Sequence, residues 1–315
     1  MAVHDVIIVG SGPAGWTAAI YTARAGMQPI VLAGTLQAGG ALMSTTEVEN
    51  YPGFPDAVLG PDLMDKMQKQ AERFGAEVLY EDAVRFELDG PVKKIHTNAQ
   101  TYEAYTVILA LGSAYKKLGF PREAELSGKG VSYCATCDGF FFKDREIVVV
   151  GGGDTAVTEA LFLARFGSTV HVVHRRDELR ASKIMANRLL ANDKIVMHWN
   201  KEVVDARGEG ALESLTLRDT VTGEESTLAA AGLFVAIGHE PRTAVLDGAV
   251  ELGDGGYIKV AEPTTATSIP GVFAAGDVVD HLYRQAVTAA GTGARAAMDS
   301  ERYLIDHKSE LESAH

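Results

Sequence analysis

The chain contains little cysteine and no long apolar segment. Its 315 residues include two cysteines, too few to build the disulfide framework of a small secreted domain. The first residues lack a basic segment followed by a small-residue cleavage site, and no apolar run approaches the roughly 18 residues that a membrane span needs. We therefore expect a protein of the cytoplasm, without a membrane segment, whose two cysteines form a redox or metal-binding pair.

Positive charge is also scarce. The chain has 29 Lys and Arg against 42 Asp and Glu, which gives a formal net charge of −13. A field of this sign repels phosphate backbones, so the composition argues against nucleic-acid binding. The simplest role of the charge is to keep the protein in solution. The length allows two ordinary domains, each with a full core.

Glycine, in contrast, is abundant, and much of it lies in short clusters at the ends of expected strands. Residues 5–32 and residues 146–173 share one pattern, in which an apolar strand leads into a glycine turn, a helix and a second strand. The expected helices cover residues 16–24 and 157–165. This is the order of elements at the start of a dinucleotide-binding domain.

Each glycine turn has the residues that a pyrophosphate site requires. The first glycine makes the turn, the second lets the backbone approach the phosphates, and the third position must be small for the helix to pack on the strand. One such turn also occurs as an incidental glycine turn, but two in the same context predict two nucleotide sites, each at a helix N-terminus. The assigned residues are Gly10, Ser11, Gly12, Pro13, Ala14 and Gly15 in the first site, and Gly151, Gly153, Asp154, Thr155 and Ala156 in the second.

The two sites differ where the adenosine ribose is expected, at the end of the second strand. In the second site this strand is followed by a basic cluster of His174, Arg175, Arg176 and Arg180. Guanidinium groups there suit a 2′-phosphate by charge and geometry, which predicts NADPH; the alternative is a solvated helix start. The first site has Ala33 and Gly34 at this place, neither an acid nor a basic cluster.

The first site has a distant partner in residues 267–277. There an apolar strand ends at Asp277, whose carboxylate can accept hydrogen bonds from a ribityl chain. Next, Arg284, Gln285 and Ala286 open a helix expected to reach about residue 303, and its positive end suits a reduced flavin. An ordinary N-cap at Asp277 is the alternative. The pattern predicts FAD on the first site.

A site shared by residues 10 and 277 means that the first domain is discontinuous. The expected boundaries lie near residues 112–115 and 238–241, which are turn-rich and follow apolar strands. We therefore expect an α/β protein with two Rossmann-like domains of the three-layer ββα type. Residues 1–113 and 242–315 form the FAD domain, and residues 114–241 form an inserted NADPH domain.

The two cysteines, Cys134 and Cys137, have Cys-x-x-Cys spacing inside the inserted domain. This spacing favours a redox-active disulfide, whereas zinc needs a second ligand pair; zinc shared by two chains and an inert pair stay as alternatives. Asp138 is placed to donate or accept a proton for a leaving thiolate, unless it only holds the turn. In residues 140–142 three phenylalanines follow, which suit either a surface that docks a protein substrate or the core.

Taken together, these motifs resemble the bacterial low-molecular-weight thioredoxin reductases over essentially the whole chain. The matching segments are residues 10–15, 46–53, 134–141, 151–156, 174–177 with Arg180, and 276–277 with 284–286. The resemblance implies a homodimer in which NADPH reduces FAD, FAD reduces the Cys134–Cys137 disulfide, and the dithiol reduces a thioredoxin. It further implies FAD contacts at residues 11–14, Asn50, Asp277 and 284–286, 2′-phosphate contacts at Arg175, Arg176 and Arg180, Cys137 as the sulfur nearer the flavin, and Asp138 as the acid–base group.

Two positions depart from the family pattern. Ala41 stands where members often have a glutamine, and Ala33 where an acid often follows the second strand. The groups that contact the adenosine ribose and part of the isoalloxazine are therefore open.

Several other functions compete with this interpretation. A ferredoxin–NADP reductase of this fold needs no Cys-x-x-Cys motif, and a dithiol oxidase or a ferredoxin-fed reductase needs no arginine cluster. The reductase of a peroxidase system carries an extra thioredoxin-like region, which we do not expect before Asp5. A related reductase acting on another small dithiol protein, and a non-catalytic flavoprotein redox sensor, remain as alternatives.

Overall fold

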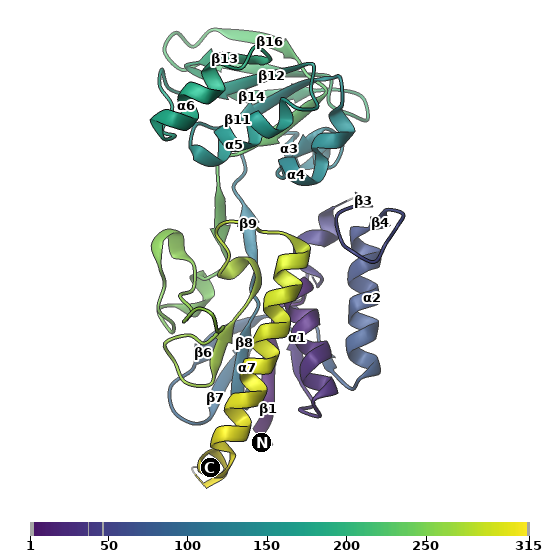
Figure 1. Ribbon diagram of the computed structural model, residues 1–315, viewed down its shortest axis with the longest axis vertical. Helices are drawn as coiled ribbons and strands as arrows, with labels where there is room; N and C mark the ends of the chain where they lie inside the picture. Colours follow the sequence, from purple (N-terminus) through teal and green to yellow (C-terminus); the bar gives the residue numbers. More distant parts are fainter. Residues whose placement is uncertain (1–2, 37, 46, 314–315) are drawn as a thin grey trace. The chain divides into compact units, whose positions relative to one another are not determined.

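The structure is a computed structural model that describes residues 3–36, 38–45 and 47–313. The chain divides into two compact units (Figure 1). The first, which we call the discontinuous unit, comprises residues 1–114 and 240–315, and the second, the inserted unit, comprises residues 115–239. The sequence analysis predicted the boundaries between the two units at 113/114 and 241/242, and the structure has them at 114/115 and 239/240.

A mostly parallel sheet forms the centre of the discontinuous unit. Its order is β5-β2-β1-β8-β7-β6, with β19 paired to β8. The strands β5, β2, β1, β8 and β19 run parallel, and β7 and β6 continue the sheet antiparallel. The bounds are β1 Val3–Val9, β2 Ile30–Leu32, β5 Glu77–Leu79, β6 Ala83–Glu87, β7 Lys93–Thr97, β8 Thr101–Leu109 and β19 Val272–Ala274.

Side chains that alternate along β1 bury two separate cores. Val6 and Ile8 point to a core shared with the helices, and Ile7 and Val9 to a core shared with β6, β7 and the segment 244–260. Helix α1 contacts both α2 and α7, as Figure 1 shows. These helices are α1 Pro13–Arg24, α2 Gly60–Arg73 and α7 Ala286–Ser313. The result is three layers.

The inserted unit repeats this plan with a five-stranded parallel sheet in the order β10-β17-β11-β12-β13. Its strands are β10 Val131–Ser132, β11 Glu146–Val150, β12 Thr169–His174, β13 Ile195–Trp199 and β17 Gly232–Val235. Helices α4 Ala135–Asp138, α5 Asp154–Leu163 and α6 Lys183–Leu190 cover one face. An antiparallel sheet of β14 Lys201–Arg207, β15 Ser214–Asp219 and β16 Glu225–Ala229 covers the other. The predicted α/β fold with two three-layer Rossmann-like domains is therefore confirmed.

The chain passes between the units along two short strands, β9 Ser113–Tyr115 and β18 His239–Pro241, which pair with each other. The pairing is extended on one side by Arg242 N–H to the Gly112 carbonyl at 3.1 Å, and on the other by Lys116 N–H to the Gly238 carbonyl at 3.1 Å. Both crossings thus form one two-stranded ribbon.

The remaining elements are short. They are β3 Glu47–Val48, β4 Val58–Leu59, α3 Glu123–Leu126, and the 3₁₀ turns η1 Gly40–Ser44, η2 Gly139–Phe142, η3 Ala244–Leu246, η4 Asp254–Gly256 and η5 Gly276–Val278. Among the helices in the described ranges, none is both long and apolar enough to cross a bilayer.

The helices differ from the expected bounds at their ends. Helices α1 and α5 begin three residues earlier than expected, at Pro13 and Asp154, because Gly12 and Gly153 have the extended backbone of N-cap residues. Pro13 also suits a first helical turn, where no backbone N–H is needed. Helix α7 continues past residue 303 to Ser313, since Leu311 is buried and anchors its last turns.

Candidate functional site

The glycine turn of the discontinuous unit is closed toward the protein and open on its other side. A side chain at Gly10 would collide with the Ala110 carbonyl, and one at Gly15 with the Gly10 carbonyl. Gly12, in contrast, has no atom within 4 Å of the place of a Cβ. The N-terminus of α1 has no side-chain cap. An uncapped helix start beside open space is what a pyrophosphate needs, so the residues present fit a bound dinucleotide.

Ser11 connects this turn to the end of β2. Its buried hydroxyl donates to the Ala33 carbonyl at 2.7 Å and accepts from the Gly39 N–H at 2.8 Å. The Gly10 N–H donates to the Leu32 carbonyl at 3.0 Å. Ser11 therefore holds the loop that follows β2, while Pro13 and Ala14 form the first turn of α1.

Asp277 lies in η5, directly after β19, beside the same turn. η5 packs closely against α1 here, because a Cβ on Gly276 would lie 2.9 Å from Ala14 Cβ. Burial, and secondly the charge of Asp280, raise the pKa of Asp277 to about 6, against the opposing effect of Arg284. This carboxyl group is poorly solvated within the protein, as expected of an acceptor whose hydroxyl donors come from a bound ligand.

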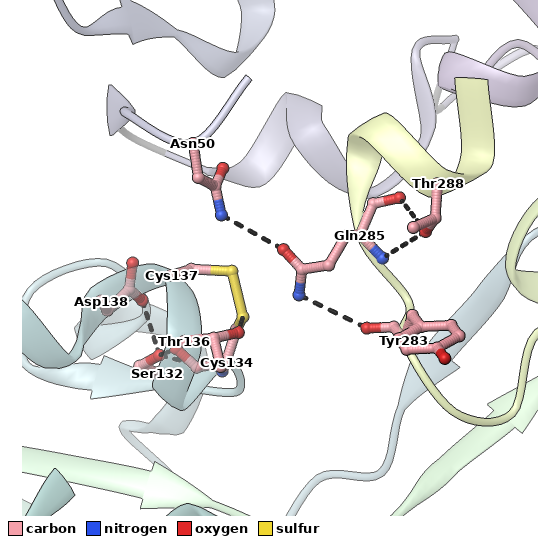
Figure 2. The surroundings of a disulfide bond; sticks show 9 residues. All are labelled: Asn50, Ser132, Cys134, Thr136, Cys137, Asp138, Tyr283, Gln285 and Thr288. Carbon is pink, nitrogen blue, oxygen red and sulfur yellow. Dashed lines mark hydrogen bonds between the residues drawn. A yellow bond between two sulfur atoms is a disulfide. The ribbon is translucent and has the colours of Figure 1, made fainter. Parts of the chain in front are cut away.

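The start of α7 is fixed by a neighbouring carboxylate. Asp280 accepts backbone hydrogen bonds from Leu282, Tyr283 and Arg284 at 2.8–2.9 Å, which holds Arg284 at a left-handed φ of 49°. Gln285 accepts a hydrogen bond from the Asn50 side-chain amide at 3.2 Å (Figure 2). Ala286 is the first residue of α7. The structure thus joins Asn50 to the Gln285 segment; Thr46, which begins the matched segment, lies outside the described residues.

The second glycine turn has the same construction. Side chains at Gly151 and Gly152 would collide with Ala236 and with the His174 ring, respectively, whereas Gly153 faces open space. Helix α5 begins without a side-chain cap, Thr155 in its first turn is exposed, and Ala156 is buried against the sheet. These residues fit a second dinucleotide on the inserted unit.

The basic segment after β12 is tied to this turn. The Gly152 carbonyl accepts from the N–H groups of Arg180 and Ala181 at 2.7 and 3.1 Å, and Asp154 accepts from the Ser182 N–H at 2.9 Å. The side chains at positions 175, 176 and 180 are exposed beside the turn. The structure thus brings the three arginines of the predicted phosphate site to one loop.

His174 occupies a different position from the arginines. It is buried, and its ring lies against Gly152, while its Nε2 lies 2.9 Å from the Glu178 carbonyl, which accepts its N–H. Burial lowers the pKa of His174. A buried neutral ring is suited to holding the loop in shape rather than to pairing with a phosphate.

The redox centre lies at the start of α4. Cys134 and Cys137 form a disulfide with their Cα atoms 5.3 Å apart (Figure 2). Cys134 is the N-cap residue of α4, and its carbonyl accepts from the N–H groups of Cys137 and Asp138 at 3.3 and 3.1 Å. Cys134 is half-buried and Cys137 exposed. One turn of helix therefore suffices to hold the two sulfurs together, and it leaves one of them accessible.

Asp138 is joined to the cysteines through Ser132, which the sequence analysis did not identify. The Ser132 hydroxyl donates to the Asp138 carboxylate at 2.6 Å and accepts from the Cys134 N–H at 3.1 Å (Figure 2). Burial raises the pKa of Asp138, although the Ser132 hydrogen bond opposes it. A carboxyl group that keeps its proton to higher pH can supply it to a thiolate. No sequence signal marked Ser132, because its role depends on the turn.

The three phenylalanines after Asp138 have two roles. Phe142 packs edge-on against Phe234, with ring centroids 5.3 Å apart, and belongs to the core side of the sheet. Phe140 and Phe141 are 61% and 45% exposed. Phe142 therefore belongs to the core and the other two rings lie on the surface, where docking of a protein substrate stays a prediction.

Known proteins of similar sequence and structure are oxidoreductases. The family model for pyridine nucleotide-disulphide oxidoreductases matches residues 4–293. The chain is 61% identical to a thioredoxin reductase of Streptomyces clavuligerus over 96% of this chain and 94% of that protein. It is 46% identical to the Escherichia coli O157:H7 enzyme of the same name over 95% of each.

Solved structures agree with these relatives. The thioredoxin reductase of Streptococcus pyogenes has a TM-score of 0.92 at 40% identity, over 97% of this chain and 99% of that one. Both nucleotide turns and the disulfide lie within the matched residues. This chain therefore belongs to the pyridine nucleotide-disulphide oxidoreductases and, within them, to the low-molecular-weight thioredoxin reductases of the bacterial type.

Proposed function

We propose that this protein is an NADPH-dependent thioredoxin-disulfide reductase that uses FAD. The observation that carries the proposal is the Cys134–Cys137 disulfide, coupled through Ser132 to Asp138, in a chain that has two open glycine turns. Flavin and pyridine nucleotide are the cofactors of this family; FAD in the discontinuous unit and NADPH in the inserted unit are the specific assignments.

The assignment of each cofactor rests on the residues beside each turn. The discontinuous unit offers Asp277 for ribityl hydroxyls, the amides of Asn50 and Gln285, and the start of α7. The inserted unit offers three exposed arginines beside its turn, which suit a 2′-phosphate. When bound, the two cofactors supply the pair of electrons that reduces the disulfide.

The residues of the chain then carry those electrons onward. Two electrons break the Cys134–Cys137 bond and leave two sulfurs, one of which takes a proton from Asp138 while the other stays a thiolate. That thiolate attacks the disulfide of a thioredoxin, which forms a mixed disulfide and releases the other thioredoxin sulfur as a thiolate. The second cysteine gives its proton back to Asp138 and attacks the cysteine sulfur of the mixed disulfide, which restores the Cys134–Cys137 bond and releases the second thioredoxin sulfur. The two thioredoxin thiolates take protons from the solvent, which completes the dithiol.

A docking site for the protein substrate lies next to the disulfide in sequence. Phe140 and Phe141 are exposed and follow Cys137 by three and four residues. Large exposed rings are typical of sites that bind another protein. We assign to them the contact with thioredoxin.

The test is oxidation of NADPH by the purified, yellow protein with and without a thioredoxin. We expect rapid oxidation only when an oxidised thioredoxin is present, and two thioredoxin thiols should appear for each NADPH oxidised. Turnover with another small dithiol protein alone would assign a different acceptor. Flavin and NADPH binding without any turnover would indicate a redox sensor. The homodimer, the lack of nucleic-acid or membrane partners and the cytoplasmic location stay predictions from the sequence.

A further inference from the structure

The first nucleotide site lacks the usual group for the adenosine ribose. In dinucleotide-binding folds an acid at the end of the second strand accepts hydrogen bonds from the ribose hydroxyls. Here β2 ends at Leu32 and is followed by Ala33, which is buried and has no polar side chain. A carboxylate for the ribose must therefore come from another part of the unit.

The segment that follows β5, the strand next to β2, has a carboxylate near the carboxyl end of β2. β5 pairs in parallel with β2, with Leu79 opposite Leu32, so their carboxyl ends meet at one edge of the sheet. The contact continues past both strands, since Ala33 N–H donates to the Leu79 carbonyl at 2.8 Å and Gly34 N–H to the Glu81 carbonyl at 3.2 Å. Asp82 is the next residue along.

The Asp82 side chain lies against the loop that follows β2. Its Oδ1 accepts from the Thr35 N–H at 3.2 Å, and its Oδ2 accepts a short hydrogen bond from the Thr35 hydroxyl. Oδ1 also lies 3.3 Å from the place that a Cβ on Gly34 would take. The carboxylate is therefore held two residues beyond Ala33, by both the backbone and the side chain of Thr35.

The same loop returns to the phosphate turn. Ser11 holds its two ends through the Ala33 carbonyl and the Gly39 N–H. A Cβ on Gly40 would lie 3.3 Å from Gly12 Cα, so the loop ends directly beside the open part of the turn. Hydrogen bonds at Ala33, Thr35 and Gly39 thus hold one loop between the glycine turn and Asp82.

Asp82 is exposed, whereas its neighbour Glu81 is half-buried. Glu81 already accepts hydrogen bonds from the hydroxyls of Thr97 at 2.6 Å and Tyr102 at 2.9 Å. Asp82 is exposed, and a carboxylate has about four lone-pair positions, two of which Thr35 occupies. We propose that Asp82 binds the ribose hydroxyls of the adenosine half of FAD, in place of the missing acid after β2. This inference rests on the proposed FAD site.

The first test compares two flavins on the flavin-free protein. FAD has the adenosine half and FMN lacks it, so Asp82→Ala should weaken FAD binding about ten- to a hundredfold and leave FMN binding within about threefold. Dissociation constants from flavin fluorescence give both values. Asp65→Ala removes an exposed acid of α2 in the same unit and should change neither. Equal FAD affinity in wild type and Asp82→Ala would overturn the inference.

The second test separates a ribose contact from a loss of loop structure. The ligand is an FAD analogue whose adenosine half lacks both ribose hydroxyls. Wild type should bind it about ten- to a hundredfold more weakly than FAD, whereas Asp82→Ala should bind both within about twofold. Undiminished discrimination in Asp82→Ala would show that Asp82 only supports the loop. A wild type that binds neither flavin would instead overturn the flavin site itself.

Discussion

At the scale of single residues, the fold changes the acid–base behaviour of two carboxyl groups that the sequence had selected. Burial raises the pKa values of Asp138 and Asp277. The hydrogen bond from Ser132 opposes the rise in the pKa of Asp138, whereas the negative charge of Asp280 adds to the rise in the pKa of Asp277. Both groups therefore keep a proton to higher pH than an exposed aspartate. This suits Asp138 for proton transfer and Asp277 for binding the hydroxyls of a ligand.

The cysteines give the most direct prediction at this scale. Cys134→Ser and Cys137→Ser should each abolish reduction of thioredoxin and still let NADPH bleach the flavin, because flavin reduction needs no sulfur and the later exchange needs both. Stopped-flow absorbance and a coupled thioredoxin assay measure the two steps. Ser226→Ala, an exposed position of β16, is the control. Thioredoxin turnover in either cysteine variant would exclude the disulfide as the electron carrier.

Asp277 gives a prediction with opposite effects on stability and binding. Its pKa of about 6 in the folded state lies above the ordinary aspartate value of 3.8. Its contribution to the free energy of unfolding is therefore fully present below pH 4 and is lost as the pH rises through 6. Asp277→Asn has no such loss. Its free energy of unfolding relative to wild type should therefore be higher at pH 7 than at pH 4, by at most about 3 kcal/mol in the flavin-free protein. Denaturant unfolding at both pH values measures the difference.

The same substitution should weaken FAD retention, since an amide accepts ribityl hydrogen bonds less well than a carboxylate, on the order of 1–3 kcal/mol. Glu47→Gln, an exposed acid of β3, should do neither. A stability difference between Asp277→Asn and wild type that did not change with pH would contradict the raised pKa.

At the scale of elements, the loop between β12 and α6 shows how a motif becomes a site. The arginines are exposed, while hydrogen bonds to Gly152 and Asp154 and the buried His174 hold the backbone that carries them. Because the backbone is already held, only the arginine side chains lose conformational freedom when they bind a phosphate.

Neutralising two of these arginines should therefore remove cofactor discrimination. Arg175→Ala with Arg176→Ala should raise the KM for NADPH strongly and leave that for NADH nearly unchanged, because each charge-assisted contact contributes on the order of 1.5–3 kcal/mol. Steady-state kinetics with both nucleotides measures the effect. Arg165→Ala, an exposed arginine stacked on Phe162, is the matched control. Full NADPH preference in the double variant would show that the arginines are only solvent-exposed surface residues.

At the scale of the whole molecule, the proposed chemistry requires movement. The nicotinamide and the Cys134–Cys137 pair are both assigned to the inserted unit, and both must reach a flavin assigned to the discontinuous unit. The dithiol must also meet a protein substrate. One orientation can hardly satisfy all three, so we expect the units to alternate about the ribbon of β9 and β18.

A reversible crosslink between the units tests this expectation. Fixing the orientation that places the disulfide on the flavin should stop steady-state turnover, and cleaving the crosslink should restore it. The same reagent attached to one unit alone is the control and should leave turnover unchanged. Undiminished turnover in the verified crosslinked protein would show that one orientation is sufficient.

Much of the fold was predictable because its signals are local. The apolar strands, the two glycine turns and the helices after them appear in the sequence near the positions that the structure shows. The helix ends differed, and the strand expected to end at Asp277 ends at Ala274, which leaves Asp277 in the following 3₁₀ turn. The length of α7 was missed because its last turns depend on burial of Leu311 rather than on a pattern around residue 303. In the site, Ser132 and Asp82 were missed because each acts on a residue from a different element.

The sequence by itself determined which chemistry the chain contains, since two nucleotide turns, an arginine cluster and a Cys-x-x-Cys motif require particular residue types at short spacings. Only the tertiary structure decided which side chains serve that chemistry through space. It buried His174 against Gly152, exposed Phe140 and Phe141 while burying most of Phe142, and placed Asp82 beside the end of β2. The physical reason is that burial, pKa and hydrogen bonding depend on neighbours brought together by sheet packing, and no local pattern records them.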